Sequence, residues 1–120
     1  MKLFSFFKKT KKIENLPFEI SLKNKEILVN ILKMGAEVQS IVLLPQNSPV
    51  LWKKDDLFWN RVSPILFPIV GKLKDDQYSL DGNIYSMKQH GFARDSEFEI
   101  LSHTDESASF RLQPTEKTLL

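Results

Sequence analysis

The sequence PILFPIVGKLKDDQYSLDGNIYSMKQHGFARD occupies residues 64–95 and carries the strongest structural signals in the chain. Its first part, residues 65–70, is almost continuously apolar, which is typical of an inner strand of a β-sandwich that is covered on both faces. Pro68 cannot donate to a central ladder, so we expect it at a bulge or at an edge position. The stretch ends near His90, one of two histidines, beside Gly91. We therefore expect a buried strand that leads the chain toward a polar cleft.

Short strands with a period of two are predicted within that stretch and on both sides of it. Apolar and polar residues alternate as they do in antiparallel strands with one face in water. Asp81-Gly82 predicts a tight hairpin, because both residues tolerate positive φ. No segment predicts a helix longer than a turn or two. The sequence therefore predicts an all-β fold, an antiparallel β-sandwich, with strands at residues 18–22, 27–31, 38–42, 78–80, 84–86, 98–102 and 107–112.

Glycine and proline mark two interruptions among the upstream strands. Gly35 follows the second predicted strand and is a candidate bulge or tight bend. Pro45 and Pro49 bracket a loop, and because proline lacks a backbone N–H, we expect the sheet to be broken there.

The composition is that of one small globular domain. The chain has 120 residues, of which 42% are hydrophobic and 27% charged. It has no cysteine, which excludes a disulfide framework, a thiolate metal site and a cysteine nucleophile, and which fits a reducing cytoplasm. His90 and His103 have no third ligand in a recognisable pattern, so we expect no metal and no other cofactor, and we interpret His103 as a surface residue.

The net charge of +2 is unevenly distributed along the chain. Residues 1–12 contain five lysines and no acidic residue, which leaves 12 basic and 15 acidic residues in the remainder. Basic residues therefore do not gather on the predicted domain, and we do not expect nucleic acid as a partner. We divide the chain into a basic, disordered tail at residues 1–17 and a partial sandwich domain at residues 18–120. The apolar group in the tail is too short for an export signal, and contact with an anionic membrane is the less favoured alternative to a solvated tail.

Three motifs occur in the same order as in a known family. They are WNR at residues 59–61, PILFPIVGKLKD at residues 64–75 and QHGFARD at residues 89–95. Through them the chain resembles the amino-terminal part of the galactose mutarotase-like, or aldose 1-epimerase, family, and within it the branch that includes the LacX proteins. The resemblance covers most of the chain, and three ordered motifs are far more specific than one short pattern.

The resemblance implies a carbohydrate isomerase that interconverts the α and β anomers of a hexose. This reaction needs a base for the proton of the anomeric hydroxyl and an acid for the ring oxygen. In the resembling family these groups are a glutamate and a histidine from later in a longer chain. We therefore expect no catalytic acid or base within these 120 residues, and no activity of this chain alone. The alternatives are a non-catalytic carbohydrate-binding fragment and a truncated product without independent activity.

The resemblance also points to substrate-binding residues. His90 matches the family's first histidine, which hydrogen-bonds sugar oxygens and orients the ring, and an imidazole suits this role because it offers both a donor and an acceptor. The alternative is a structural histidine at a strand end. Lys72 stands where many relatives carry an arginine, and an ammonium group cannot hold two adjacent hydroxyls as the arginine fork does.

Arg61, Arg94 and Trp59 complete the predicted site. Similar arginines help to hold the phosphate in relatives that use phosphorylated hexoses, so the expected ligand is a hexose or a hexose phosphate. Each arginine could equally form an ion pair at the surface. The indole ring of Trp59 could stack on the apolar face of a sugar or pack in the core.

Overall fold

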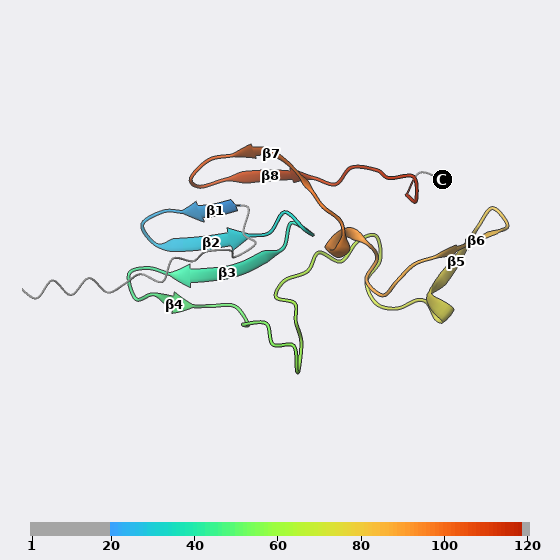
Figure 1. Ribbon diagram of the computed structural model, residues 1–120, viewed down its shortest axis with the longest axis horizontal. Coiled ribbons are helices and arrows are strands. Elements are labelled where there is room, and N and C mark those ends of the chain that lie inside the picture. The colour runs from blue at the N-terminus through green and yellow to red at the C-terminus, as the bar shows by residue number, and fades with distance from the viewer. Residues whose placement is uncertain (1–19, 119–120) are drawn as a thin grey trace, which may run out of the picture.

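The computed structural model describes residues 20–118, so the predicted tail at residues 1–17 lies outside the described part (Figure 1). Four strands form one antiparallel sheet in the order β1-β2-β3-β4, and two separate antiparallel hairpins follow, β5-β6 and β7-β8. The strands are β1 Ile20–Lys23, β2 Ile27–Ile31, β3 Val38–Leu43, β4 Ser48–Pro49, β5 Gln77–Leu80, β6 Asn83–Ser86, β7 Glu99–His103 and β8 Ala108–Arg111, and the 3-10 helices are η1 Lys74–Asp76 and η2 Ala93–Asp95. Within residues 20–118 no helix is long and apolar enough to cross a membrane.

The period-two pattern predicted the strands correctly. Each of the seven segments predicted from this pattern overlaps an observed strand, although the start of the first, residues 18–19, lies outside the described part. Asp81 and Gly82 form the turn of the β5-β6 hairpin with φ of 50° and 80°. The all-β, antiparallel class is therefore confirmed.

The alternation places a polar row on one face of the four-stranded sheet. Ser21, Asn30 and Ser40 lie opposite one another on β1, β2 and β3. Ser21 Oγ donates to Asn30 Oδ1 at 2.6 Å, and Asn30 Nδ2 donates to Ser40 Oγ at 2.8 Å. On the other face Ile20 pairs with Ile31, and both are buried. A slip of one residue would move the polar row into the core, so this pattern fixes the register.

The turn between β2 and β3 brings the sheet against the segment around η2. Gly35 has a φ of 72°, and its N–H donates to the Ser96 carbonyl at 2.7 Å. A Cβ at Gly35 would lie 2.8 Å from the carbonyl oxygen of Arg94, so only glycine allows this close approach. The predicted bend at Gly35 is confirmed. The small core spans this junction and consists of Ile20, Ile31, Ala93 and Phe98.

The prediction of an inner strand at residues 65–70 is wrong. The segment is irregular and forms one isolated parallel bridge, between Phe67 and Gly91. Pro64 and Pro68 lack the N–H groups that a ladder needs, which explains why the apolar run does not pair as a strand. The described residues do not cover it on both faces either, since Phe67 is 53% exposed.

The expected break of the sheet between Pro45 and Pro49 is also wrong. The sheet continues into β4, where Pro49 pairs with Val42 and Ser48 pairs with Leu43. Since β4 is the outer strand of this sheet, a proline is tolerated there, because its missing N–H is not needed by a further strand.

Candidate functional site

A cavity of about 380 Å³ lies where the loop after β4 meets the loop before η2. Three of the five predicted site residues line it, namely Trp59, His90 and Arg94, whereas Arg61 and Lys72 do not. Its lining residues are Trp59, Val62, Ser63, Pro64, Leu66, Gln89, His90 and Arg94. The cavity therefore joins all three of the motifs that the sequence singled out.

His90 is held by two hydrogen bonds to one glycine. Its backbone N–H donates to the Gly71 carbonyl at 2.8 Å, and the Gly71 N–H donates to His90 Nδ1 at 2.9 Å. Because Nδ1 accepts, the neutral ring carries its proton on Nε2. Nε2 lies 3.3 Å from the side-chain amide of Gln89, which can accept once its oxygen is turned toward the ring. The backbone thus fixes both the orientation and the tautomer of the imidazole.

The loop that carries His90 packs directly on the segment of Phe67. Gly91 has a φ of 75°, and a Cβ there would lie 2.1 Å from the Phe67 carbonyl oxygen. That oxygen accepts hydrogen bonds from the N–H groups of Phe92, at 3.0 Å, and Ala93, at 3.2 Å. The rings of Phe67 and Phe92 meet edge to face at 6.2 Å. The irregular segment thus packs against the loop that carries His90 and supports it.

Arg94 and Trp59 bring different chemistry to the cavity. Arg94 Nη2 donates to the Gln89 carbonyl at 2.7 Å, while its Nε is buried with no hydrogen-bond acceptor among the described residues. Trp59 is 49% exposed, and its carbonyl accepts the indole N–H of Trp52 at 3.1 Å. The site therefore combines a cation with an accessible aromatic ring, which is a combination that suits a polar ligand with an apolar face.

Arg61 and Lys72 have other partners in the structure. Arg61 is paired with Glu37, at 3.3 Å, and with Asp95. Lys72 is 61% exposed and lies 3.7 Å from Asp76, with which it forms an ion pair four residues along the chain. Their predicted contact with substrate stays a prediction.

Several cavity residues escaped the sequence reasoning. Gln89 belongs to a recognised motif but had no role assigned to it, and Val62 and Ser63 directly follow the WNR motif. The sequence signal that could have indicated their place in the site was their position in or next to those motifs. None of the eight lining residues is a carboxylate, and His90 is the one histidine among them. The lining of this cavity therefore does not supply a pair of proton carriers.

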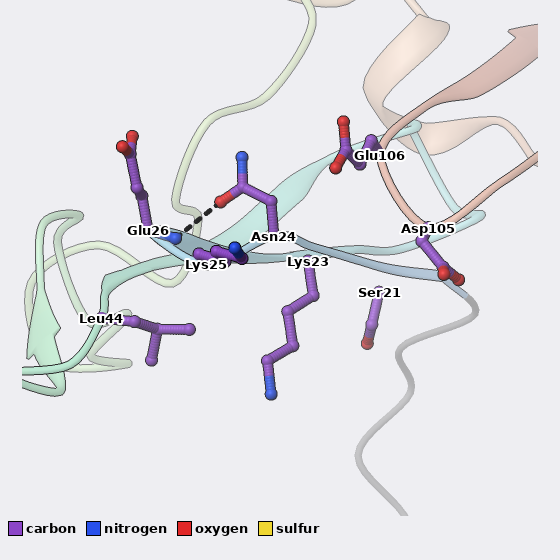
Figure 2. A pocket seen from close by; sticks show the side chains of 8 residues that line it. All are labelled: Ser21, Lys23, Asn24, Lys25, Glu26, Leu44, Asp105 and Glu106. Carbon is purple, nitrogen blue, oxygen red and sulfur yellow. Dashed lines mark hydrogen bonds between the residues drawn. The ribbon is translucent and has the colours of Figure 1, made fainter.

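A second hollow, of about 820 Å³, lies between the β1-β2 turn and the β7-β8 turn (Figure 2). The two turns are joined by the Lys23 N–H, which donates to the Asp105 carbonyl at 2.6 Å. The side chains of Lys23 and Glu106 point to opposite sides, and almost all of the lining residues are exposed. This hollow is larger than the His90 cavity, but no buried polar group faces it, so it is the weaker candidate.

Comparison with known proteins decides the family. The aldose 1-epimerase family model matches residues 19–118. The chain belongs to the aldose 1-epimerase family. It is 31% identical to the chromosomal LacX protein of Lactococcus lactis subsp. lactis, a match that covers 83% of this chain and 35% of LacX. The resemblance to the LacX branch is therefore confirmed.

Solved structures related to galactose mutarotase share the fold of this aldose 1-epimerase family member. A galactose mutarotase related enzyme from Lactobacillus acidophilus matches with a TM-score of 0.81 and 41% identity, over 82% of this chain and 33% of that protein. A galactose mutarotase-like protein from Lactobacillus casei ATCC 334 matches with a TM-score of 0.79 and 41% identity, over 83% of this chain and 34% of that protein. The chain thus spans about a third of the length of these relatives.

Proposed function

We propose that the His90 cavity binds a hexose, and that this chain is the sugar-orienting, amino-terminal part of an aldose 1-epimerase-like isomerase. The observation that carries the proposal is the hydrogen bond from the Gly71 N–H to His90 Nδ1, at 2.9 Å. It leaves Nε2–H as the donor of the ring, which suits a hydroxyl or ring oxygen of a sugar. Trp59 would stack on the apolar face of the sugar, and Arg94 would donate to its hydroxyls.

The proposed reaction of the complete isomerase is the interconversion of hexose anomers. A base takes the proton of the anomeric hydroxyl, the bond between C1 and the ring oxygen breaks, and an acid protonates the ring oxygen. The C1–C2 bond then rotates before the ring closes again. His90 would orient the ring in this scheme, and the acid and the base would come from outside the 120 residues. We therefore expect this chain to bind sugar without turnover.

A hexose phosphate is a second candidate ligand. The buried Nε of Arg94 has no hydrogen-bond acceptor among the described residues, and the nearest carboxylate oxygen, on Asp95, is 3.9 Å away. Arg94 lines the cavity, and a guanidinium group can bind phosphate through two parallel hydrogen bonds. Tighter binding of a hexose phosphate than of the free hexose would favour this candidate.

The test is a calorimetric titration of the chain with glucose, galactose and glucose 6-phosphate. We expect His90→Asn to weaken binding by about two- to tenfold, which corresponds to the loss of one neutral hydrogen bond. Asparagine is chosen because His90 has a φ of 65°, a conformation that asparagine tolerates better than most residues. His103→Asn is the matched control, because His103 is exposed on β7 and does not line the cavity.

Two results would contradict parts of this proposal. An absence of binding heat with all three sugars, confirmed by unchanged tryptophan fluorescence, would refute the sugar site and favour a truncated product without independent activity. Polarimetry on fresh α-glucose tests the second part. Anomerisation by this chain well above the buffer rate would show that it does contain a working acid and base.

A further inference from the structure

The most buried charged side chain in the described part of the structure is Glu37, which is 2% exposed. It stands at the end of the tight turn between β2 and β3. Its Oε1 accepts the N–H groups of Val62, at 2.8 Å, and Ser63, at 3.2 Å. A buried carboxylate is stable only when such donors and an opposite charge replace water.

Arg61 supplies the opposite charge and extends the contact to a third part of the chain. Its Nη1 lies 3.3 Å from Glu37 Oε2 and donates to the Arg94 carbonyl at 3.0 Å. Its Nη2 donates to Asp95 Oδ1. We call these contacts of Glu37 and Arg61 the Glu37–Arg61 clamp. The clamp joins the β2-β3 turn, the loop after β4 and the 3-10 helix η2 (Figure 1).

Both walls of the His90 cavity are attached to this clamp. Val62 and Ser63, whose N–H groups Glu37 accepts, belong to one wall. Arg94, whose carbonyl Arg61 holds, belongs to the other wall. The guanidinium group of Arg94 in turn donates to the Gln89 carbonyl at 2.7 Å, next to His90. The separation of the two walls is therefore set by groups that do not line the cavity themselves.

We propose that Glu37 and Arg61 are positioning residues that set the spacing of the two walls and so the affinity of the cavity for its ligand. This inference rests on the proposed hexose site. Neither side chain lines the cavity, so their effect on the ligand runs through Val62, Ser63 and Arg94. Substrate affinity is sensitive to such placement, because a displaced contact loses most of its hydrogen-bond energy.

The experiment compares two substitutions of Glu37 in the full chain. Glu37→Met has a similar size but no acceptor and no charge, whereas Glu37→Gln keeps an acceptor for the N–H groups of Val62 and Ser63. We expect the dissociation constant for the best-binding of glucose, galactose and glucose 6-phosphate to rise about tenfold or more in Glu37→Met and about threefold in Glu37→Gln. Glu99→Met is the matched control, since Glu99 forms an exposed ion pair on the β7-β8 hairpin.

The amide NMR signals of Val62 and Ser63 give a second readout. Hydrogen bonds to a carboxylate should move these amide protons downfield, and we expect the shift to be lost in Glu37→Met and partly kept in Glu37→Gln. The signals of Gln89 and Arg94 should move with them, because the clamp reaches both walls. Far-UV circular dichroism establishes that each variant is folded, and Glu37→Gln carries the test if Glu37→Met does not fold.

The outcomes separate this inference from the proposed function. A folded Glu37→Met variant with the affinity of the unchanged chain would overturn the clamp, because a residue that only stabilises the fold alters stability and not the affinity of the folded protein. If the unchanged chain binds none of the sugars, the proposed function is refuted. The NMR signals alone then decide whether the clamp sets the positions of the two cavity walls. Movement of the Gln89 and Arg94 signals would then support the clamp, and its absence would refute it.

Discussion

Replacing Gly91 with alanine tests whether the His90 loop depends on close backbone contact with the segment of Phe67. Gly91 is buried, has a φ of 75°, and would bring a Cβ to 2.1 Å from the Phe67 carbonyl oxygen. That atom belongs to the backbone and cannot rotate away like a flexible side chain. The alanine variant must therefore move one chain segment away from the other.

The expected destabilisation has two parts. A left-handed conformation costs a non-glycine residue about 1–2 kcal/mol. The displaced Phe67 carbonyl also loses its hydrogen bonds from Phe92 and Ala93, at 3.0 and 3.2 Å, and each such bond contributes about 0.5–1.5 kcal/mol. Together these terms predict a loss of about 2–5 kcal/mol, which is a large part of the total stability of an ordinary domain.

Urea unfolding followed by circular dichroism measures this loss, and Gly82→Ala is the matched control. Gly82 has a φ of 80° in the β5-β6 turn, but a Cβ there meets nothing within 4 Å. This variant should therefore lose only the conformational part, about 1–2 kcal/mol. Equal losses in the two alanine variants would refute the argument, because the contact with Phe67 would then contribute nothing.

Two smaller predictions concern the hairpins. Hydrogen bonds from Arg111, and then Gln113, lower the pKa of Glu99 below its usual 4.5, so the stability it contributes is present above that value and is lost as the pH falls through the lowered pKa. The midpoint temperature of thermal unfolding should therefore be lower in Glu99→Gln than in the unchanged chain near neutral pH. The difference should be small because the ion pair is exposed, and it should vanish in strong acid. Asp81→Val should destabilise the β5-β6 hairpin by about 1–2 kcal/mol, whereas Asp81→Asn should be nearly neutral, because φ is 50° there; hydrogen exchange of the hairpin amides measures both.

Local sequence predicted those elements whose cause is local. Alternation in β2 and β3 follows from successive side chains on a strand pointing to opposite faces, and the hairpin turn follows from the conformational freedom of Asp81-Gly82. Burial at residues 65–70 could not be read in the same way, because whether an apolar side chain is covered depends on which other elements pack on it. The position of β4 at the edge of the sheet likewise could not be predicted, since the sequence near Pro49 does not indicate which strand is the last one in the sheet.

Some residues of the candidate site could likewise be predicted from local sequence, and others could not. His90, Arg94 and Trp59 stand in motifs and were predicted from them, and the structure brings all three to one cavity. Glu37 stands in no motif, and its partner Arg61 is 24 positions away in the chain, so no local pattern connects the two. A carboxylate in an otherwise ordinary strand start is expected at the surface. Only the fold shows that it is buried and holds the cavity walls.

The failed strand prediction at residues 65–70 and the packing of the His90 loop on this segment have one physical cause. The prolines in residues 64–68 prevent this segment from joining a ladder, which leaves its polar backbone groups without strand partners. One of those groups is used twice by the neighbouring loop, since the Phe67 carbonyl accepts both the Phe92 and the Ala93 N–H groups. A few residues later Gly71 donates to His90 Nδ1 and accepts from its backbone N–H. A regular strand at residues 65–70 would have paired the Phe67 carbonyl with a neighbouring strand, so the irregular backbone leaves this carbonyl available to the loop that carries His90.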